Sequence, residues 1–82
     1  DEVLRFEPHS ALFSPEAGLA HLRAVIAQAA RLLRPGGLLL LEHGAAQGKA
    51  VRELLSAGDA FAGIATRRDL AGLERCALAW KV

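Results

Sequence analysis

One stretch decides the fold: Arg34-Pro35-Gly36-Gly37-Leu38-Leu39-Leu40-Leu41-Glu42-His43-Gly44. Its four leucines form an unbroken apolar run without alternation between two faces. A membrane span needs about 20 apolar residues, so this run is too short to cross a bilayer. It is typical of a strand in a parallel sheet with helices on both faces. Pro35 and the two glycines end a preceding helix and turn the chain into the strand, which Gly44 ends.

A helix is predicted before this strand. Ser14 is a suitable N-cap, Pro15 suits the first helical position, and Glu16 suits the positive end of the helix dipole. Apolar residues then recur at helical spacing up to the predicted end: Leu19, Leu22, Ile26, Ala29, Ala30 and Leu33. Residues 1–13 show no clear period, so we expect a connecting loop there.

Three further elements follow the leucine strand. A second helix is predicted from Ala46 to Ala57, then strands Phe61–Arg68 and Arg75–Lys81. The short connection between these two strands predicts an antiparallel hairpin. The leucine strand and Phe61–Arg68 are joined through a helix, so they should lie parallel with a right-handed crossover. They need not be neighbours, because the last strand can insert between them. The predicted class is α/β, in the order helix, strand, helix, strand, strand.

Composition limits the possible functions. The 82 residues are 52% hydrophobic and carry a net charge of +1. A chain of this size buries only about 60% of its surface, so this apolar content predicts a segment that more protein covers. The start at Asp1 and the lack of methionine also lead us to expect a fragment. No Lys or Arg run indicates nucleic-acid binding, and no signal peptide or membrane segment is visible. One cysteine excludes an internal disulfide and a multi-cysteine metal site, and a reducing cytoplasm is the simplest setting.

Three stretches together resemble a known family. They are Arg5-Phe6-Glu7-Pro8 with Ala11-Leu12; Gly36 to Gly44 with Gln47-Gly48-Lys49-Ala50-Val51-Arg52; and Arg68-Asp69-Leu70-Ala71-Gly72 with Arg75. Their order and spacing resemble the C-terminal part of the HemK/PrmC family, over nearly all 82 residues. Members of this family methylate the side-chain amide nitrogen of a glutamine in peptide chain release factors.

The resemblance implies the C-terminal portion of a Rossmann-like, class I methyltransferase that uses S-adenosylmethionine. Leu38–Leu41, Phe61–Arg68 and Arg75–Lys81 would be its fifth, sixth and seventh strands. The family's glycine-rich cofactor loop and its Asn-Pro-Pro-Tyr substrate motif do not occur here, and the chain has no Tyr or Asn. No catalytic or cofactor residue can therefore be assigned, and we expect the isolated segment, a single unit over residues 1–82, to be inactive. The strand at Leu38–Leu41 would also lose a neighbour, which predicts self-association through an uncovered edge.

Three residues are candidates for the substrate side of the site. Glu42 and His43 end the leucine strand, and the carboxyl ends of parallel strands form the ligand edge of such sheets. The alternative is a charged strand end that meets water or caps the next helix. Glu7 is a candidate for fixing the loop that carries the substrate motif, or is an ordinary loop carboxylate.

Other polar residues are predicted to have structural roles. His9 and His21 lack partners at ligand spacing, so no metal site is expected. Cys76 alternates with Leu78 and Trp80 in a strand and is expected to be a small core residue. The arginines Arg67, Arg68 and Arg75 are expected on a solvated hairpin edge, and the alternative is that they face an acidic or RNA-rich partner. Asp69 and Gly72 are expected to shape the hairpin connection.

Two other functions remain open at this point. The chain could be a free-standing α/β interaction module, or a piece of another Rossmann-type enzyme such as a dehydrogenase. An upstream glycine-rich loop together with Asn-Pro-Pro-Tyr would decide for the methyltransferase. For that enzyme the expected partner is a release factor, with no direct nucleic-acid or membrane contact.

Overall fold

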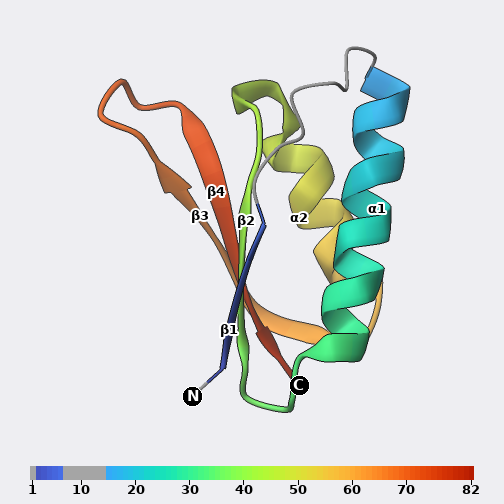
Figure 1. Ribbon diagram of the computed structural model, residues 1–82. Coiled ribbons are helices and arrows are strands. Elements are labelled where there is room, and N and C mark those ends of the chain that lie inside the picture. Colours follow the sequence, from blue (N-terminus) through green and yellow to red (C-terminus); the bar gives the residue numbers. More distant parts are fainter. Residues whose placement is uncertain (1, 7–14) are drawn as a thin grey trace.

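The computed structural model describes residues 2–6 and 15–82, leaving aside the side chains of residues 15–17 and 45. In chain order its elements are β1 (Val3–Phe6), α1 (Pro15–Leu32), β2 (Leu38–Glu42), the 3-10 turn η1 (Ala45–Gln47), α2 (Gly48–Ser56), β3 (Phe61–Arg68) and β4 (Glu74–Lys81). These elements form one sheet with a layer of helices packed against it (Figure 1).

The predicted elements from residue 15 onward are confirmed, with boundaries that differ by at most two residues. The second predicted helix differs in type at its start: its first turn is the separate 3-10 turn η1, and the α-helix α2 begins only at Gly48. The predicted cap at Ser14 lies outside the described residues.

The sheet has the strand order β1-β2-β4-β3. β1 runs parallel to β2, and β4 runs antiparallel to both β2 and β3. β2 and β3 are therefore parallel to each other, with β4 inserted between them. The predicted parallel pair, the closing hairpin and the inserted last strand are all confirmed.

The hydrophobic core lies between the sheet and the two helices. Its buried members come from α1 and the residue after it (Leu22, Val25, Ala29, Leu33), from α2 (Val51, Leu55) and from the strands (Leu39, Leu41, Phe61, Ala77, Ala79). The four residues of the first group recur at intervals of three or four, which places them on one helical face. Burying a leucine as fully as Leu39 contributes about 1.5–3 kcal/mol.

Both helices cover the same face of the sheet (Figure 1). The crossovers β1-α1-β2 and β2-α2-β3 step across the sheet in the same direction, and right-handed crossovers of this kind put their helices on one side. The expectation of helices on both faces is therefore wrong for the described residues. Leu38 and Leu40 point to the other side, here called the open face, and are only partly buried.

The predicted loop over residues 1–13 is wrong for Val3–Phe6. These four residues form β1, which pairs with β2 in the register Val3↔Leu38 to Phe6↔Leu41. The predicted uncovered edge on the leucine strand is wrong for the same reason, since β1 occupies it. β1 becomes the edge strand of the described sheet.

The prediction that Cys76 is a core residue is also wrong. Its alternation with Leu78 is confirmed, but both residues line a hollow on the open face together with Leu38 and Leu40. Cys76 is half-buried there, and Trp80 further along β4 is 48% exposed.

Within the described residues, neither α1 nor α2 combines the length and the apolar character that a membrane-crossing helix needs.

Candidate functional site at the carboxyl edge of the sheet

The three mutually parallel strands end at one edge of the sheet. β1 ends at Phe6, β2 at Glu42 and β3 at Arg68, and we call this end the carboxyl edge. In open α/β sheets, ligands bind outside the carboxyl ends of the strands. The side chains at this edge are therefore the first place to look for a site.

Glu42 is tied to the neighbouring strand. Its Oε2 accepts hydrogen bonds from Nε of Arg5 at 2.9 Å and from Nη2 of Arg5 at 2.6 Å. This ion pair joins the ends of β1 and β2 on the open face. The exposed Arg5 guanidinium and the partly exposed Glu42 carboxylate both remain in reach of solvent.

His43 follows directly but points to the opposite face of the sheet, because side chains alternate along a strand. It is the buried polar residue of the described chain, with 3% of its surface exposed. Its backbone N–H donates to the carbonyl of Arg75 at 2.9 Å, which extends the pairing of β2 with β4 by one residue.

The hydrogen bonding of His43 fixes its tautomer. Nδ1 lies 2.8 Å from the carbonyl oxygen of Gly44, which can only accept, so Nδ1 carries the proton. In the neutral imidazole, Nε2 is then a hydrogen-bond acceptor. Nε2 is buried and has no hydrogen-bond partner among the described residues. Such a group is unusual in a folded protein and requires an explanation.

The loop after β2 holds His43 in place. The backbone N–H of Gly44 donates to Oε1 of Gln47 at 2.8 Å, and the backbone N–H of Gln47 donates to the Gly44 carbonyl at 3.0 Å. Gly44 thus forms a reciprocal pair with Gln47 at the start of η1. The same Gly44 carbonyl accepts the hydrogen bond that Nδ1–H of His43 donates.

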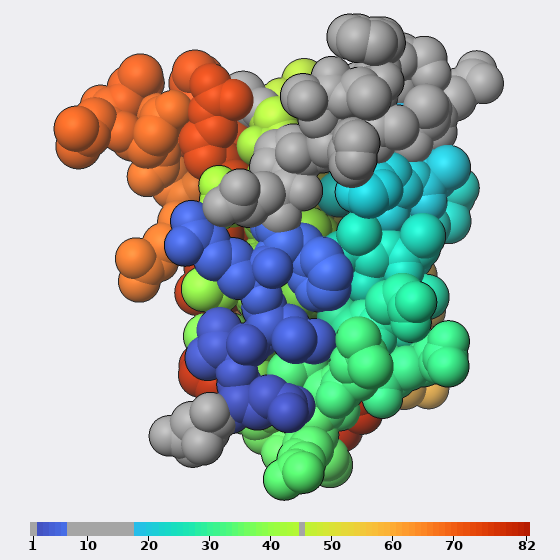
Figure 2. Space-filling view, in the orientation of Figure 1, coloured from blue at the N-terminus to red at the C-terminus, as the bar shows by residue number. Residues whose placement is uncertain are grey.

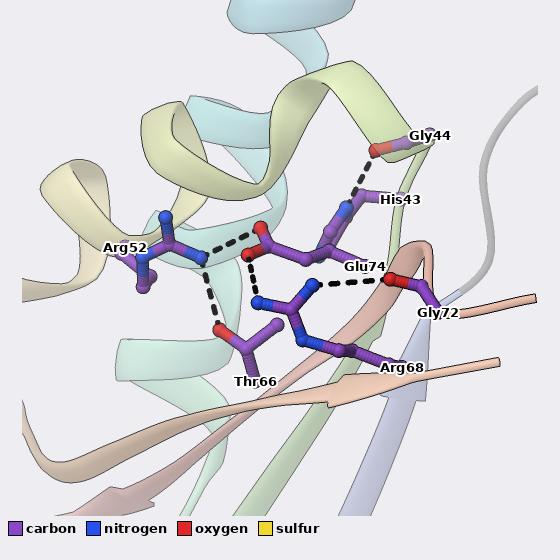
Figure 3. A network of polar contacts seen from close by, with 7 residues as sticks. All are labelled: His43, Gly44, Arg52, Thr66, Arg68, Gly72 and Glu74. Atoms are coloured by element: carbon purple, nitrogen blue, oxygen red, sulfur yellow. Dashed lines mark hydrogen bonds and ion pairs between the residues drawn. The ribbon is translucent and has the colours of Figure 1, made fainter.

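A polar network that the sequence did not reveal lies next to His43 (Figure 3). The carboxylate of Glu74, at the start of β4, accepts from Arg52 of α2 at 2.8 Å and from Arg68 of β3 at 3.3 Å. Arg52 also donates to the hydroxyl of Thr66 at 3.1 Å, and Arg68 donates to the carbonyl of Gly72 at 3.0 Å. The network joins α2, β3, β4 and the hairpin connection at the carboxyl edge.

Gly48 makes room for this network. A Cβ added at Gly48 would overlap Oε1 of Glu74. The spacing of Gly48 and Arg52 on one helical face was the available signal, since residues four apart are neighbours on a helix. The hydrogen bond from Arg52, aided by the charges of Arg52 and Arg68, lowers the pKa of Glu74 against the opposing effect of desolvation.

An extra residue in β4 lets Glu74 reach the helix side. Cys76 pairs with Arg67, but Glu74 pairs with Arg68, so β4 carries one more residue than β3 between these pairs. A bulge of this kind reverses the alternation of side chains beyond it. Without it, Glu74 would face the same side as Cys76.

The hairpin connection between β3 and β4 is organised by Asp69, as predicted. Oδ1 of Asp69 accepts the backbone N–H groups of Ala71 at 2.9 Å and Leu73 at 3.0 Å, and Oδ2 accepts Nε of Arg75 at 3.1 Å. Gly72 has a φ of +83°, a conformation that side chains disfavour. The hydrogen bond from the Leu73 amide, followed by that from Arg75, lowers the pKa of Asp69. The predicted structural roles of Asp69 and Gly72 are thus confirmed.

Cys76 is poorly suited to nucleophilic chemistry. Burial, and next the nearby Glu42 carboxylate, raise the pKa of the Cys76 thiol, so the reactive thiolate is disfavoured. Across the described part of the chain, no three His, Cys, Asp or Glu side chains are grouped so that they could hold a metal ion.

The remaining candidates are placed as follows. Glu7 and His9 lie outside the described residues, so the structure does not bear on them. Glu42 and His43 are both at the carboxyl edge but on opposite faces of the sheet. His21 lies on α1 and is partly buried.

The strand order, with an antiparallel last strand inserted beside a parallel one, is that of the C-terminal part of a class I methyltransferase sheet. Comparison with known proteins narrows this class. The release factor glutamine methyltransferase of Pseudomonas aeruginosa is 56% identical over 75 residues, which are 92% of this chain and 27% of that protein. The corresponding protein of Burkholderia pseudomallei is 50% identical over 72 residues, 88% of this chain and 25% of that protein. That of Yersinia pestis is 44% identical over 80 residues, 96% of this chain and 29% of that protein.

These similarities identify the chain as a segment of a protein of the release factor glutamine methyltransferase (HemK/PrmC) family. The chain spans about a quarter of the length of the curated relatives it matches. No family model matches it.

Proposed function

We propose that this chain is the C-terminal part of an enzyme that transfers a methyl group from S-adenosylmethionine to a glutamine side-chain amide nitrogen in peptide chain release factors. The observation that carries the proposal is the 44–56% identity, over nearly the whole chain, to proteins named release factor glutamine methyltransferase. The segment alone is proposed to be inactive, because it has neither a glycine-rich cofactor loop nor an Asn-Pro-Pro-Tyr motif. No observation favours a free-standing interaction module or a dehydrogenase.

The chemistry assigns this segment a positioning role. An amide nitrogen is a weak nucleophile, so its methylation depends on orientation and on acceptors that hold the amide. In our proposal the carboxyl edge supplies one wall of the substrate site. The wall is fixed on the open face by the Arg5–Glu42 ion pair and on the helix face by the loop that holds His43.

His43 is the residue of this wall that we propose to act on the substrate side. Its buried Nε2 is an acceptor without a partner in the described residues. We propose that in the complete enzyme Nε2 accepts a hydrogen bond from the release factor. This bond would position the part of the release factor that carries the glutamine. Glu42 is proposed to act only through Arg5, as a link between strands. Glu7 stays a prediction.

The full-length methyltransferase that contains this segment provides the test. Purified enzyme, S-adenosylmethionine and a release factor are combined, and a gain of one methyl group on a glutamine is measured by mass spectrometry. His43→Leu is expected to lower the rate with the fold intact. Leu32→Gln, at a 60% exposed position on α1, is the matched control and should keep full activity. A wild-type enzyme that methylates no glutamine would refute the proposed function.

The proposed substrate acts in translation termination, so we propose a cytoplasmic location. The proposed partner is the release factor, with no direct nucleic-acid or membrane contact.

We also propose that the isolated segment self-associates. The open face carries Leu38, Leu40 and Leu78, and half-exposed Trp80 continues it. β1 adds a free strand edge, which can pair with another chain. Light scattering should show a dimer or larger species for the 82-residue chain, and a shift toward monomer for Leu78→Glu but not for Leu32→Glu. A wild-type monomer would contradict this.

A further inference from the structure

The connection between β3 and β4, residues 69–73, projects at the carboxyl edge. β3 is parallel to β2, so the connection that follows Arg68 emerges on the same side of the sheet as Glu42 and His43. Figure 1 shows the hairpin leaning away from the helices at this end. In the space-filling view it stands out at the margin of the molecule (Figure 2). We call residues 69–73 the hairpin tip.

The hairpin tip presents two leucines to solvent. Leu70 is fully exposed, with a relative exposure of 110%, and Leu73 is 45% exposed. A single exposed leucine is common on protein surfaces and needs no explanation. Here two exposed leucines lie on one five-residue connection and form an apolar projection. This projection is at the carboxyl edge, where ligands of such sheets bind.

The backbone that carries these leucines is held rigidly. The side chain of Asp69 accepts hydrogen bonds from two backbone N–H groups of the connection. The backbone of Asp69 also forms hydrogen bonds with the backbone of Leu73 and of Gly72. Arg68 closes the turn from outside by donating to the Gly72 carbonyl. An anchor that is already ordered loses little conformational entropy on binding. The hydrogen bonds therefore maintain the exposed leucines in one geometry.

One positive charge beside the hairpin tip is left over by its ion pairs. Arg67, Arg68 and Arg75 flank the tip, but Arg68 is paired with Glu74 and Arg75 with Asp69. Arg67 is exposed and forms no ion pair with another described residue. A partner that approaches the tip thus meets an apolar surface with the positive charge of Arg67 beside it, which complements an acidic surface that also carries apolar groups.

We propose that the hairpin tip is a docking element for an acidic, apolar-bearing surface of the protein substrate, at a distance from the glutamine that receives the methyl group. This inference rests on the function proposed above. The tip is convex, and small-molecule sites are concave, so a protein surface fits it and a cofactor does not. Leu70 is the anchor, and Arg67 provides electrostatic attraction.

Steady-state kinetics of the full-length methyltransferase test this docking. KM and kcat are measured with a whole release factor and with a short peptide that contains only the glutamine region. Leu70→Asp is expected to raise KM for the whole protein by about tenfold or more, as for loss of an interface anchor, with kcat unchanged. The peptide, which cannot reach the tip, should show unchanged kinetics. Arg67→Glu should raise KM for the whole protein and weaken its dependence on salt.

Matched controls separate docking from general surface effects. Leu32→Asp places the same charge at a 60% exposed leucine on α1, and Arg23→Glu reverses an exposed charge on the same helix. Both should behave as wild type with either substrate.

Three other results would contradict docking through the hairpin tip. Equal KM values for Leu70→Asp and wild type would overturn it, as would an equal loss with peptide and whole protein. A large fall in melting temperature for Leu70→Asp would also overturn it, because it would show that the tip packs against the enzyme itself. If the wild-type enzyme methylates neither substrate, the proposed function fails and the docking proposal fails with it.

Discussion

Replacing His43 with leucine is expected to stabilise the fold. Most substitutions of buried residues have the opposite effect and destabilise by about 1 kcal/mol. His43 differs because its buried Nε2 has no hydrogen-bond partner among the described residues. Leucine is close to histidine in size and removes both ring nitrogens, so the core needs little rearrangement.

The magnitude follows from two opposing contributions. The hydrogen bond from Nδ1 of His43 to the Gly44 carbonyl, at 2.8 Å, contributes about 0.5–1.5 kcal/mol and would be lost. The buried, unpaired Nε2 costs about 1–3 kcal/mol, and this cost would disappear. The Gly44 carbonyl stays satisfied, because the backbone N–H of Gln47 still donates to it. The net gain in unfolding free energy is about 1 kcal/mol.

Urea unfolding of the 82-residue chain measures this gain, and it is followed by the fluorescence of Trp80, the single tryptophan of that chain. With a slope of about 1 kcal/mol per molar, the midpoint should rise by about 1 M. Leu41→Ala, two residues earlier on the same buried side, is the control and should cost about 2–5 kcal/mol. A lower midpoint for His43→Leu would refute the reasoning, because it would show that Nε2 is paired in solution and that His43 is an ordinary structural residue.

Three further predictions concern the scaffold. Gly48→Ala should lower the urea midpoint although alanine is the better helix former, because its Cβ would displace the Glu74 carboxylate; an unchanged midpoint would contradict the close approach. Glu74 and Asp69 have pKa values lowered below their usual 4.5 and 3.8, so the stability they contribute is present above those values and is lost as pH falls below them. Melting temperatures recorded between neutral and acid pH should show this decline, with a shallower one in Glu74→Gln. Gly63→Ala should cost about 1–2 kcal/mol by urea unfolding followed by circular dichroism, because Gly63 has a φ of +63° and its added Cβ would meet Trp80 at 2.8 Å; a Trp80→Ala background should remove only the steric part.

The sequence predicted those parts of the fold that local pattern determines. The leucine run, the Pro-Gly-Gly turn and the helical spacing before it define β2 and α1 without any knowledge of neighbours. The short connection at residues 69–73 could only form a hairpin. The order of the sheet then followed, because a helical crossover requires parallel strands and the hairpin requires an antiparallel one.

β1 could not be predicted from its own sequence pattern, because the strand it pairs with lies elsewhere in the chain. Val3–Phe6 is only four residues long and its burial alternates between exposed and intermediate, which is a weak signal. What makes it a strand is the hydrogen-bonding edge of Leu38–Leu41, more than 30 residues away. An isolated four-residue segment has no such template, so its sequence resembles a loop.

The sequence predicted the strand end at which Glu42 and His43 lie, but not the face of the sheet that each occupies. Glu42 and His43 do lie at the carboxyl edge, yet strand alternation puts them on opposite faces, where one pairs with Arg5 and the other is buried. Glu74 was missed because a one-residue bulge reverses its direction, and a bulge depends on the pairing of two strands. No periodicity within β4 alone contains that information.

The residues that carry the family resemblance form the support of His43. Gln47 closes the loop by pairing with Gly44, whose carbonyl in turn orients the imidazole. Gly48 leaves the space through which the Glu74 carboxylate reaches α2. None of these residues needs to touch a substrate to be required, because each fixes the position of the next. A buried acceptor held this firmly, and left without a partner in the described residues, is best explained by a donor supplied from outside them.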